Sequence, residues 1–224
     1  MHPRPVYRRF AIALVALASL VAVAPVAADF TPLILTAEPA PQSHVIDGMP
    51  ALGQWWNLSC EYAATSAATA FYGATISQQT FADDIGFDPN PNIAFRGRLS
   101  GPWGGTTDYG IYPAPILRVL MARGFPHSYR FQADTGLLRA AIARDHPVVV
   151  WIVGTFGSAP RYEEEREGAR YLLVPYEHAV TAYGYNESGI MLMDPAIGGY
   201  RTVAWPTFIA AWTQLDGMAL VVAP

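Results

Sequence analysis

Cys60 is the only cysteine of the 224-residue chain, and a lone thiol can serve as a nucleophile. A disulfide within the chain is excluded because there is no second thiol. Cys60 follows Ser59, a candidate N-cap, and opens an alanine-rich segment that predicts a helix over residues 60–71. The free N–H groups and the dipole at a helix start favour a negative sulfur, so we expect a lowered thiol pKa, although Glu61 opposes it by charge. A buried inert cysteine and a bridge between two molecules are the alternatives.

A thiolate needs a base to take its proton, and His178 is the candidate. It begins an apolar strand, where a polar side chain requires a partner. A hairpin turn at residues 186–189 pairs position 178 near position 196 and so brings Asp194 beside the ring. The carboxylate can then orient the imidazole, which gives a Cys-His-Asp triad. The alternatives are a hydrogen-bonded structural histidine and an aspartate that starts a turn before proline.

Two further side chains are candidates for binding substrate. Gln54 lies six residues before Cys60, and its amide can join the Cys60 backbone N–H in an oxyanion hole. An ordinary surface glutamine is the alternative. Residues 88–112 are rich in Pro, Gly and Asn and predict a loop that walls the cleft, with Trp103 as a candidate substrate contact or, equally, a packed loop anchor.

The secondary-structure elements that must position these residues are mainly helices in the first part of the chain and mainly strands in the second part. This order predicts an α+β fold with an antiparallel sheet. The charged segment from Glu163 to Arg170 is interpreted as a solvated loop or a short helix. Helices are predicted over 60–71, 77–84, 113–123, 135–145 and 206–212, and strands over 128–132, 147–153, 171–174, 178–185, 190–193, 200–204 and 218–222.

Residues 1–28 have the pattern of an export signal. Arginines precede an apolar run over residues 10–24, and the small residues 26–28 follow it, which predicts cleavage after Ala28 and a secreted or extracytoplasmic protein. A retained anchor is the alternative, and only then would the protein be bound to a membrane. We expect residues 29–46 to be an extended tail and residues 47–224 to be a single domain.

Charge and composition narrow the classes of partner. Beyond residue 28 the chain carries 11 arginines, no lysine and 18 carboxylates, a net charge of −7 with histidine neutral. That balance argues against nucleic acid and against anionic lipid as partners. The histidines are scattered and no phosphate-binding glycine motif precedes a helix, so we predict no metal and no cofactor. The expected partner is a peptide or protein substrate.

Four segments, in order, resemble the papain-like cysteine peptidases and, more closely, cysteine-peptidase family 39, the bacteriocin-processing double-glycine leader type, in its exported stand-alone branch. They are Gln54 to Glu61, Asp145 to Trp151, His178 to Asn186, and Met193 to Pro195 with Gly198 and Gly199. The transporter-linked members typically have Asp-Cys-Gly where this chain has Ser59-Cys60-Glu61. The resemblance therefore does not imply processing of an exported leader.

The resemblance implies a papain-like fold, with the nucleophile helix packed on a C-terminal antiparallel sheet. It also implies a thiol peptidase that acts through a thioester acyl-enzyme. Cys60 would be the nucleophile, His178 the general base and acid, Asp194 the orienting carboxylate and Gln54 the oxyanion donor.

Other functions remain open for the same residues. An amidase or transpeptidase acting on cell-wall peptides would use the same triad, and a non-catalytic papain-like binding module would keep the shape alone. The presence of all four polar groups favours an enzyme.

Overall fold

The computed structural model describes residues 40–224. The predicted signal segment and residues 29–39 of the predicted tail lie outside the described residues. The remaining residues of that tail belong to the domain, because β1 (His44–Val45) pairs with strand β6 (Glu177–Tyr185). None of the helices described over 40–224 has the length and apolar character needed to cross a bilayer.

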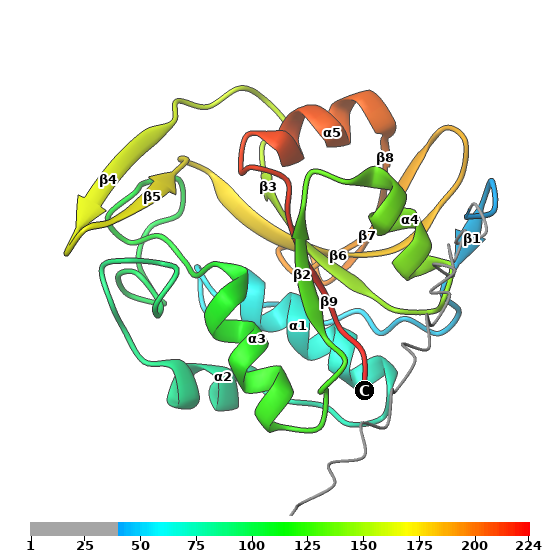
Figure 1. Ribbon diagram of the computed structural model, residues 1–224, viewed down its shortest axis with the longest axis horizontal. Coiled ribbons are helices and arrows are strands. Elements are labelled where there is room, and N and C mark those ends of the chain that lie inside the picture. Colours follow the sequence, from blue (N-terminus) through cyan, green and yellow to red (C-terminus); the bar gives the residue numbers. More distant parts are fainter. Residues whose placement is uncertain (1–39) are drawn as a thin grey trace, which may run out of the picture. The chain divides into compact units, whose positions relative to one another are not determined.

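A seven-stranded sheet runs through the middle of the domain (Figure 1). Its strands pair antiparallel in the order β2-β9-β3-β6-β7-β8, with β1 paired to β6. The residues of β3 are buried on both faces, which explains their continuous apolar run. Besides β1 and β6, the strands are β2 (Tyr129–Gln132), β3 (Val148–Val153), β7 (Gly189–Asp194), β8 (Gly199–Ala204) and β9 (Met218–Val221).

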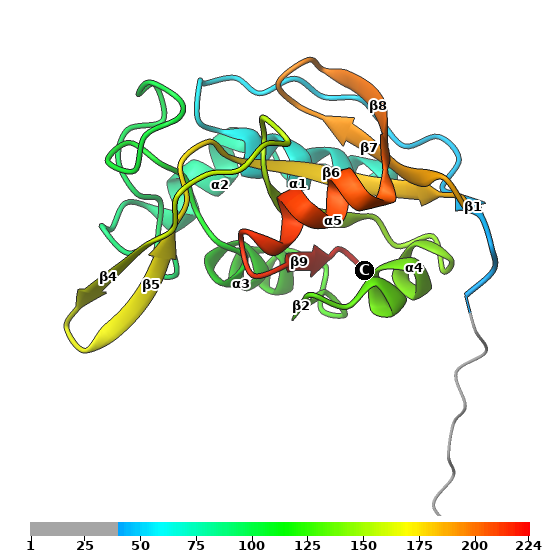
Figure 2. The same ribbon diagram turned by 90° about the horizontal axis from the view of Figure 1, so that it is seen from above.

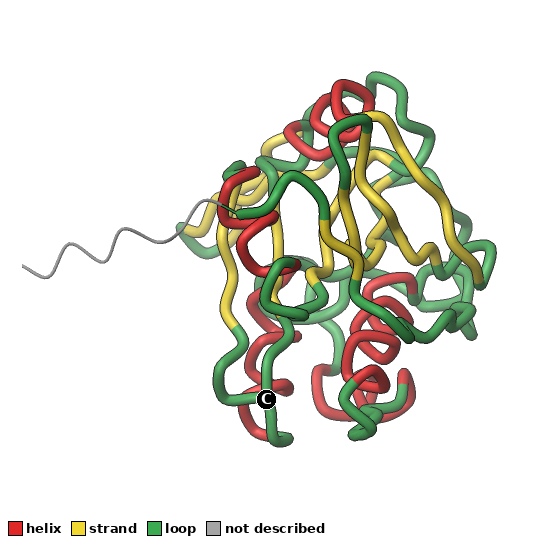
Figure 3. The backbone as a smooth tube through the Cα atoms, turned by 90° about the vertical axis from the view of Figure 1, so that its right-hand side faces the viewer, coloured by secondary structure: helices red, strands yellow, loops and turns green. Residues whose placement is uncertain are grey.

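Helices cover both faces of this sheet, so the fold is α+β with a core on each side. In Figures 1 and 3 the strands lie between two groups of helices. Along β3, Val149 and Trp151 pack in the core of the first group, whereas Val150 and Ile152 pack in the core of the second. The first group is α1 (Cys60–Phe71), α2 (Gln78–Ile85) and α3 (Pro113–Ala122), and the second is α4 (Thr135–Ile142) and α5 (Trp205–Thr213).

Helix α1 is the most deeply buried helix near the sheet, with residues 60–69 all buried. Its alanines let the backbone approach β6 closely, and the Thr181 hydroxyl donates to the Ala64 carbonyl at 2.9 Å. Gly73, at φ +72°, takes the left-handed conformation that follows a helix end. The predicted cap is wrong in one respect, since the Ser59 hydroxyl caps no helix N–H and instead contacts Gln78 at 3.0 Å.

The charged segment forms a hairpin, so its interpretation as a loop or short helix is wrong. Strands β4 (Tyr162–Arg166) and β5 (Ala169–Leu173) pair antiparallel and project from the sheet (Figure 2). Glu167 and Gly168 connect them with φ of 53° and 78°, and two positive φ angles in a two-residue loop give the twist that favours a hairpin. The other predicted elements are present, with ends that differ by a few residues.

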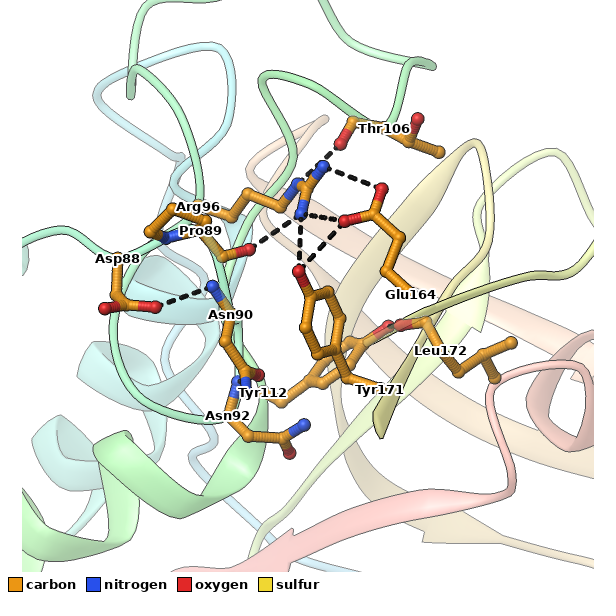
Figure 4. A network of polar contacts seen from close by, with 10 residues as sticks. All are labelled: Asp88, Pro89, Asn90, Asn92, Arg96, Thr106, Tyr112, Glu164, Tyr171 and Leu172. Atoms are coloured by element: carbon orange, nitrogen blue, oxygen red, sulfur yellow. Dashed lines mark hydrogen bonds and ion pairs between the residues drawn. The ribbon is translucent and has the colours of Figure 1, made fainter. Parts of the chain in front are cut away.

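Residues 88–112 carry no helix or paired strand of ordinary length, yet the partly buried guanidinium of Arg96 gives them a fixed path (Figure 4). Arg96 donates to the carbonyls of Pro89 and Thr106, both at 2.7 Å. It also donates to both carboxylate oxygens of Glu164 in β4, at 2.8 and 3.1 Å. The loop and the β4–β5 hairpin are therefore held as one unit.

We expect Thr181→Val to lower the free energy of unfolding by about 1 kcal/mol, because it removes one buried hydrogen bond without changing the side-chain shape much. Thermal and urea unfolding would measure the change. Thr202→Val, on the exposed side of β8, is the matched control and should change stability little. Equal stability of Thr181→Val and the wild type would show that this bond does not hold α1 to the sheet.

Candidate active site

A groove of about 430 Å³ opens on the face of the domain where α1 begins. All five residues singled out from the sequence line it: Gln54, Cys60, Trp103, His178 and Asp194. The remaining lining residues are Trp55, Trp56, Asn57, Gly154, Ala196 and Arg201. The structure therefore brings together side chains that are up to 140 positions apart in the sequence.

The contact between α1 and β6 brings the thiol to the histidine strand. Cys60 is the first residue of α1, and His178 is the second residue of β6. The backbone N–H of Ala179, next to His178, donates to Cys60 Sγ at 3.4 Å. The sulfur is thus fixed at the start of β6, beside the backbone that carries the imidazole.

His178 and Asp194 form the hydrogen bond that the hairpin register predicts. His178 Nε2 lies 2.8 Å from Asp194 Oδ1, and both side chains are buried. A β-bulge between Ala182 and Gly184 shifts the register, so that Thr181 pairs with Met193. With Nε2 engaged by the carboxylate, Nδ1 is the ring nitrogen left for proton exchange with the thiol.

Arg201 is a functional candidate that sequence reasoning missed. Its guanidinium contacts Asp194 Oδ2 at 2.6 Å, while the Ala196 N–H donates to Asp194 Oδ1 at 2.9 Å. Burial by itself raises the pKa of Asp194, but the His178 hydrogen bond and charge, the Ala196 N–H and the Arg201 charge together bring it below its ordinary value. The carboxylate is therefore held ionised and oriented. Only the position of Arg201 in β8, beside β7, could have signalled this contact.

The environment of Cys60 differs from the expectation of a lowered thiol pKa. Burial raises the pKa of Cys60 well above its ordinary value, and the charges of Glu61 and Glu177 raise it further, against the Ala179 N–H. The side chain of Glu61, whose direction the sequence left open, points at the sulfur, with Sγ 3.3 Å from Oε2. Burial and the two carboxyls therefore raise the thiol pKa by more than the helix dipole and the free N–H groups lower it. The resting thiol is protonated.

Glu61 and Glu177 form a buried carboxyl pair beside the sulfur. Glu61 Oε1 accepts the Ile111 N–H at 2.6 Å, whereas neither oxygen of Glu177 has a hydrogen-bond partner among the described residues. Burial raises the pKa of Glu61 to about 7, and burial with the nearby Glu61 charge raises that of Glu177 well above its ordinary range. The sequence contained a signal for Glu177, since it heads a strand buried on both faces, as His178 does.

Gln54 lies in the groove wall, but its amide is already occupied. Nε2 donates to the carbonyls of Trp56 and Asn57, at 3.0 and 2.7 Å, and Oε1 is buried without a partner among the described residues. Donation to a substrate oxyanion requires one of these two bonds to be exchanged. In the resting structure Gln54 holds the turn that precedes Cys60.

Trp103 is both a groove residue and a loop anchor. Its indole N–H donates to the Glu177 carbonyl at 2.8 Å, and its ring packs edge-on against Tyr176. The exposed fraction of Trp103 is nevertheless 46%, and that of Trp55, on the groove wall, is 62%. Gly154 gives the rings room, since a Cβ there would lie 2.8 Å from His178 Cβ and 3.0 Å from Trp103.

Comparison with known proteins identifies the family and supports the fold. The model of the Peptidase_C39 like family matches residues 46–220. A candidate C39-like peptidase from Bacillus anthracis superposes with a TM-score of 0.71 at 18% identity, over 82% of this chain and 98% of that one. The peptidase domain of Streptococcus ComA, a bifunctional ABC transporter of a quorum-sensing pathway, gives 0.50 at 15% identity, over 79% and 98%. A search of curated proteins finds no match.

We expect Arg201→Gln to weaken activity more at pH 5 than at pH 7. Without the guanidinium the pKa of Asp194 rises, so its carboxylate is protonated sooner as the pH falls, and the acid limb of the activity profile moves to higher pH. Hydrolysis rates between pH 4 and pH 8 would measure the shift. Arg166→Gln, on the exposed hairpin, is the control and should leave the acid limb unchanged. An unmoved acid limb in Arg201→Gln would contradict a role for Arg201 at Asp194.

Proposed function

Because this chain belongs to the Peptidase_C39 like family and is a papain-like cysteine peptidase, we propose that it hydrolyses peptide bonds through a triad of Cys60, His178 and Asp194. One observation carries the proposal. The His178–Asp194 hydrogen bond of 2.8 Å lies in the same groove as the chain's single thiol, whose sulfur accepts the N–H of the residue after His178.

The first half of the reaction transfers the acyl group to sulfur. As Cys60 Sγ attacks the carbonyl carbon, His178 Nδ1 takes the thiol proton. Because burial and the carboxyl pair keep the resting thiol protonated, this transfer accompanies the attack instead of preceding it as a stable ion pair. The C–N bond then breaks, His178 returns the proton to the leaving amine, and a thioester remains on Cys60.

The second half releases the product. His178 removes a proton from water as the water oxygen attacks the thioester carbon. As the C–S bond then breaks, His178 passes this proton to the leaving sulfur, which restores the thiol and the neutral imidazole. Asp194 orients the imidazole and balances its positive charge in both halves. The Cys60 backbone N–H, at a helix start without an intrahelical acceptor, stabilises the oxyanion, and Gln54 joins it by giving up its bond to Asn57.

The groove supports a peptide or protein as the substrate. Its walls carry the exposed rings of Trp55 and Trp103, which can pack against side chains on either side of the reacting bond.

Purified protein under reducing conditions should cleave members of a peptide library, measured by mass spectrometry. Cys60→Ala and His178→Ala should each lower kcat/KM by about 10³-fold or more, and Gln54→Ala by about 10- to 10³-fold. His127→Ala and Gln132→Ala, at exposed positions, are matched controls and should retain wild-type rates. Cleavage by Cys60→Ala, or turnover of cell-wall fragments with no hydrolysis of linear peptides, would contradict the proposal.

The proposal includes export through the signal at residues 1–28. Its support is the arginine-rich start, the apolar run and the small residues before Asp29. N-terminal sequencing of the protein from the extracytoplasmic fraction should begin at Asp29. A retained N-terminus in the membrane fraction would identify an anchor instead.

A further inference from the structure

We propose that Cys60, Glu61 and Glu177 form a binding site for a thiophilic divalent cation, of which Zn²⁺ is the physiological representative, and that the ion blocks the nucleophile. The Cys60 sulfur and one carboxylate oxygen from each glutamate all lie within 4.8 Å of one another, and the three side chains are buried. Two of the ligands start α1 and the third starts β6, so the packing of these elements forms the site.

The unpartnered carboxyl of Glu177 points to a ligand. Its two oxygens are buried and accept no hydrogen bond from the described residues. Among residues 40–224, no arginine or histidine forms an ion pair with Glu61 or Glu177. A buried carboxyl without a donor is costly, and either protons or a cation must offset that cost. A cation bound among the three side chains would give the Cys60 sulfur and one carboxylate oxygen of each glutamate a partner at the same time.

The neighbouring hydrogen bonds orient the ligands for this purpose. The Ile111 N–H holds Glu61 Oε1 at 2.6 Å, so that Oε2 is turned to the sulfur. The Ala179 N–H contacts the sulfur at 3.4 Å. Such outer contacts fix the orientation of metal ligands in known sites.

Size and donor type select the class of ion. Zn²⁺ bonds of roughly 2.0–2.3 Å in a tetrahedral shell put ligand atoms about 3.5 Å apart. The three ligand atoms already lie within 4.8 Å of one another, so small side-chain shifts bring them to that spacing. A thiolate is a soft ligand that suits Zn²⁺ or Cd²⁺, whereas Mg²⁺ and Ca²⁺ take oxygen ligands alone. The sequence did not suggest this site because adjacent residues 60 and 61 are not a known ligand spacing and Glu177 is far along the chain.

Binding replaces the thiol proton by the ion. The S–H proton and any proton held by the two carboxyls pass to solvent as the metal–sulfur and metal–oxygen bonds form, and no electron transfer is involved. The sulfur lone pair that would attack a carbonyl is then engaged, which would inhibit the enzyme reversibly. Inhibition rests on the proposed peptidase function, but binding of the ion does not.

Cd²⁺ is the probe, because its bond to a thiolate produces an ultraviolet charge-transfer band. Titration of the full-length protein with Cd²⁺ should give this band at one equivalent, and Cys60→Ala should abolish it. Glu177→Gln should weaken binding by about tenfold or more, whereas Glu187→Gln, at an exposed turn, should bind as the wild type does. Mg²⁺ should neither produce the band nor compete.

His178→Ala separates this site from a cysteine–histidine pair. We expect His178→Ala to bind Cd²⁺ within about threefold of the wild type, even though it would be inactive as a peptidase. Circular dichroism and the Tm of each variant show whether it is folded. Wild-type affinity in a folded Glu177→Gln, or loss of the band in a folded His178→Ala, would overturn the proposal. Binding with no peptidase activity in any condition would overturn the proposed function alone.

Discussion

The packing of the first turn of α1 against the first residues of β6 is the contact on which the site depends. Two bonds define it, one from the Ala179 N–H to the Cys60 sulfur and one from Thr181 to the Ala64 carbonyl. Small side chains along α1 make this close approach possible. The groove, the triad and the carboxyl pair all follow from the same packing, because each contains residues from both elements or their immediate neighbours.

This packing has an electrostatic consequence for the nucleophile. The helix start that should favour a thiolate is buried together with Glu61 and Glu177, and desolvation with their charges keeps the proton on sulfur. Asp194 experiences the opposite balance, since bonds from His178 and the charge of Arg201 keep it ionised despite burial. The site therefore contains a protonated thiol and an ionised orienting carboxylate, with the imidazole as the group that can move a proton.

Much of this arrangement could be predicted from the sequence where periodicity and turns are strong. The continuous apolar run of β3 predicted a buried strand of the sheet. The turn between β6 and β7 predicted a hairpin that places Asp194 near His178. The β4–β5 hairpin was not predicted from its local pattern, and its hydrogen bond with Arg96 joins it to a loop that is distant in the sequence. The same holds for Arg201 and for the direction of Glu61, which are fixed by partners that only the folded chain brings close.

The rate of Cys60 alkylation by iodoacetamide as a function of pH tests the central claim without knowledge of the substrate. If His178 takes the thiol proton, the wild type should react near neutral pH. In a folded His178→Ala variant, alkylation should rise only at alkaline pH, because the buried thiol must then lose its proton to solvent. Superimposable profiles for the two proteins would contradict the account.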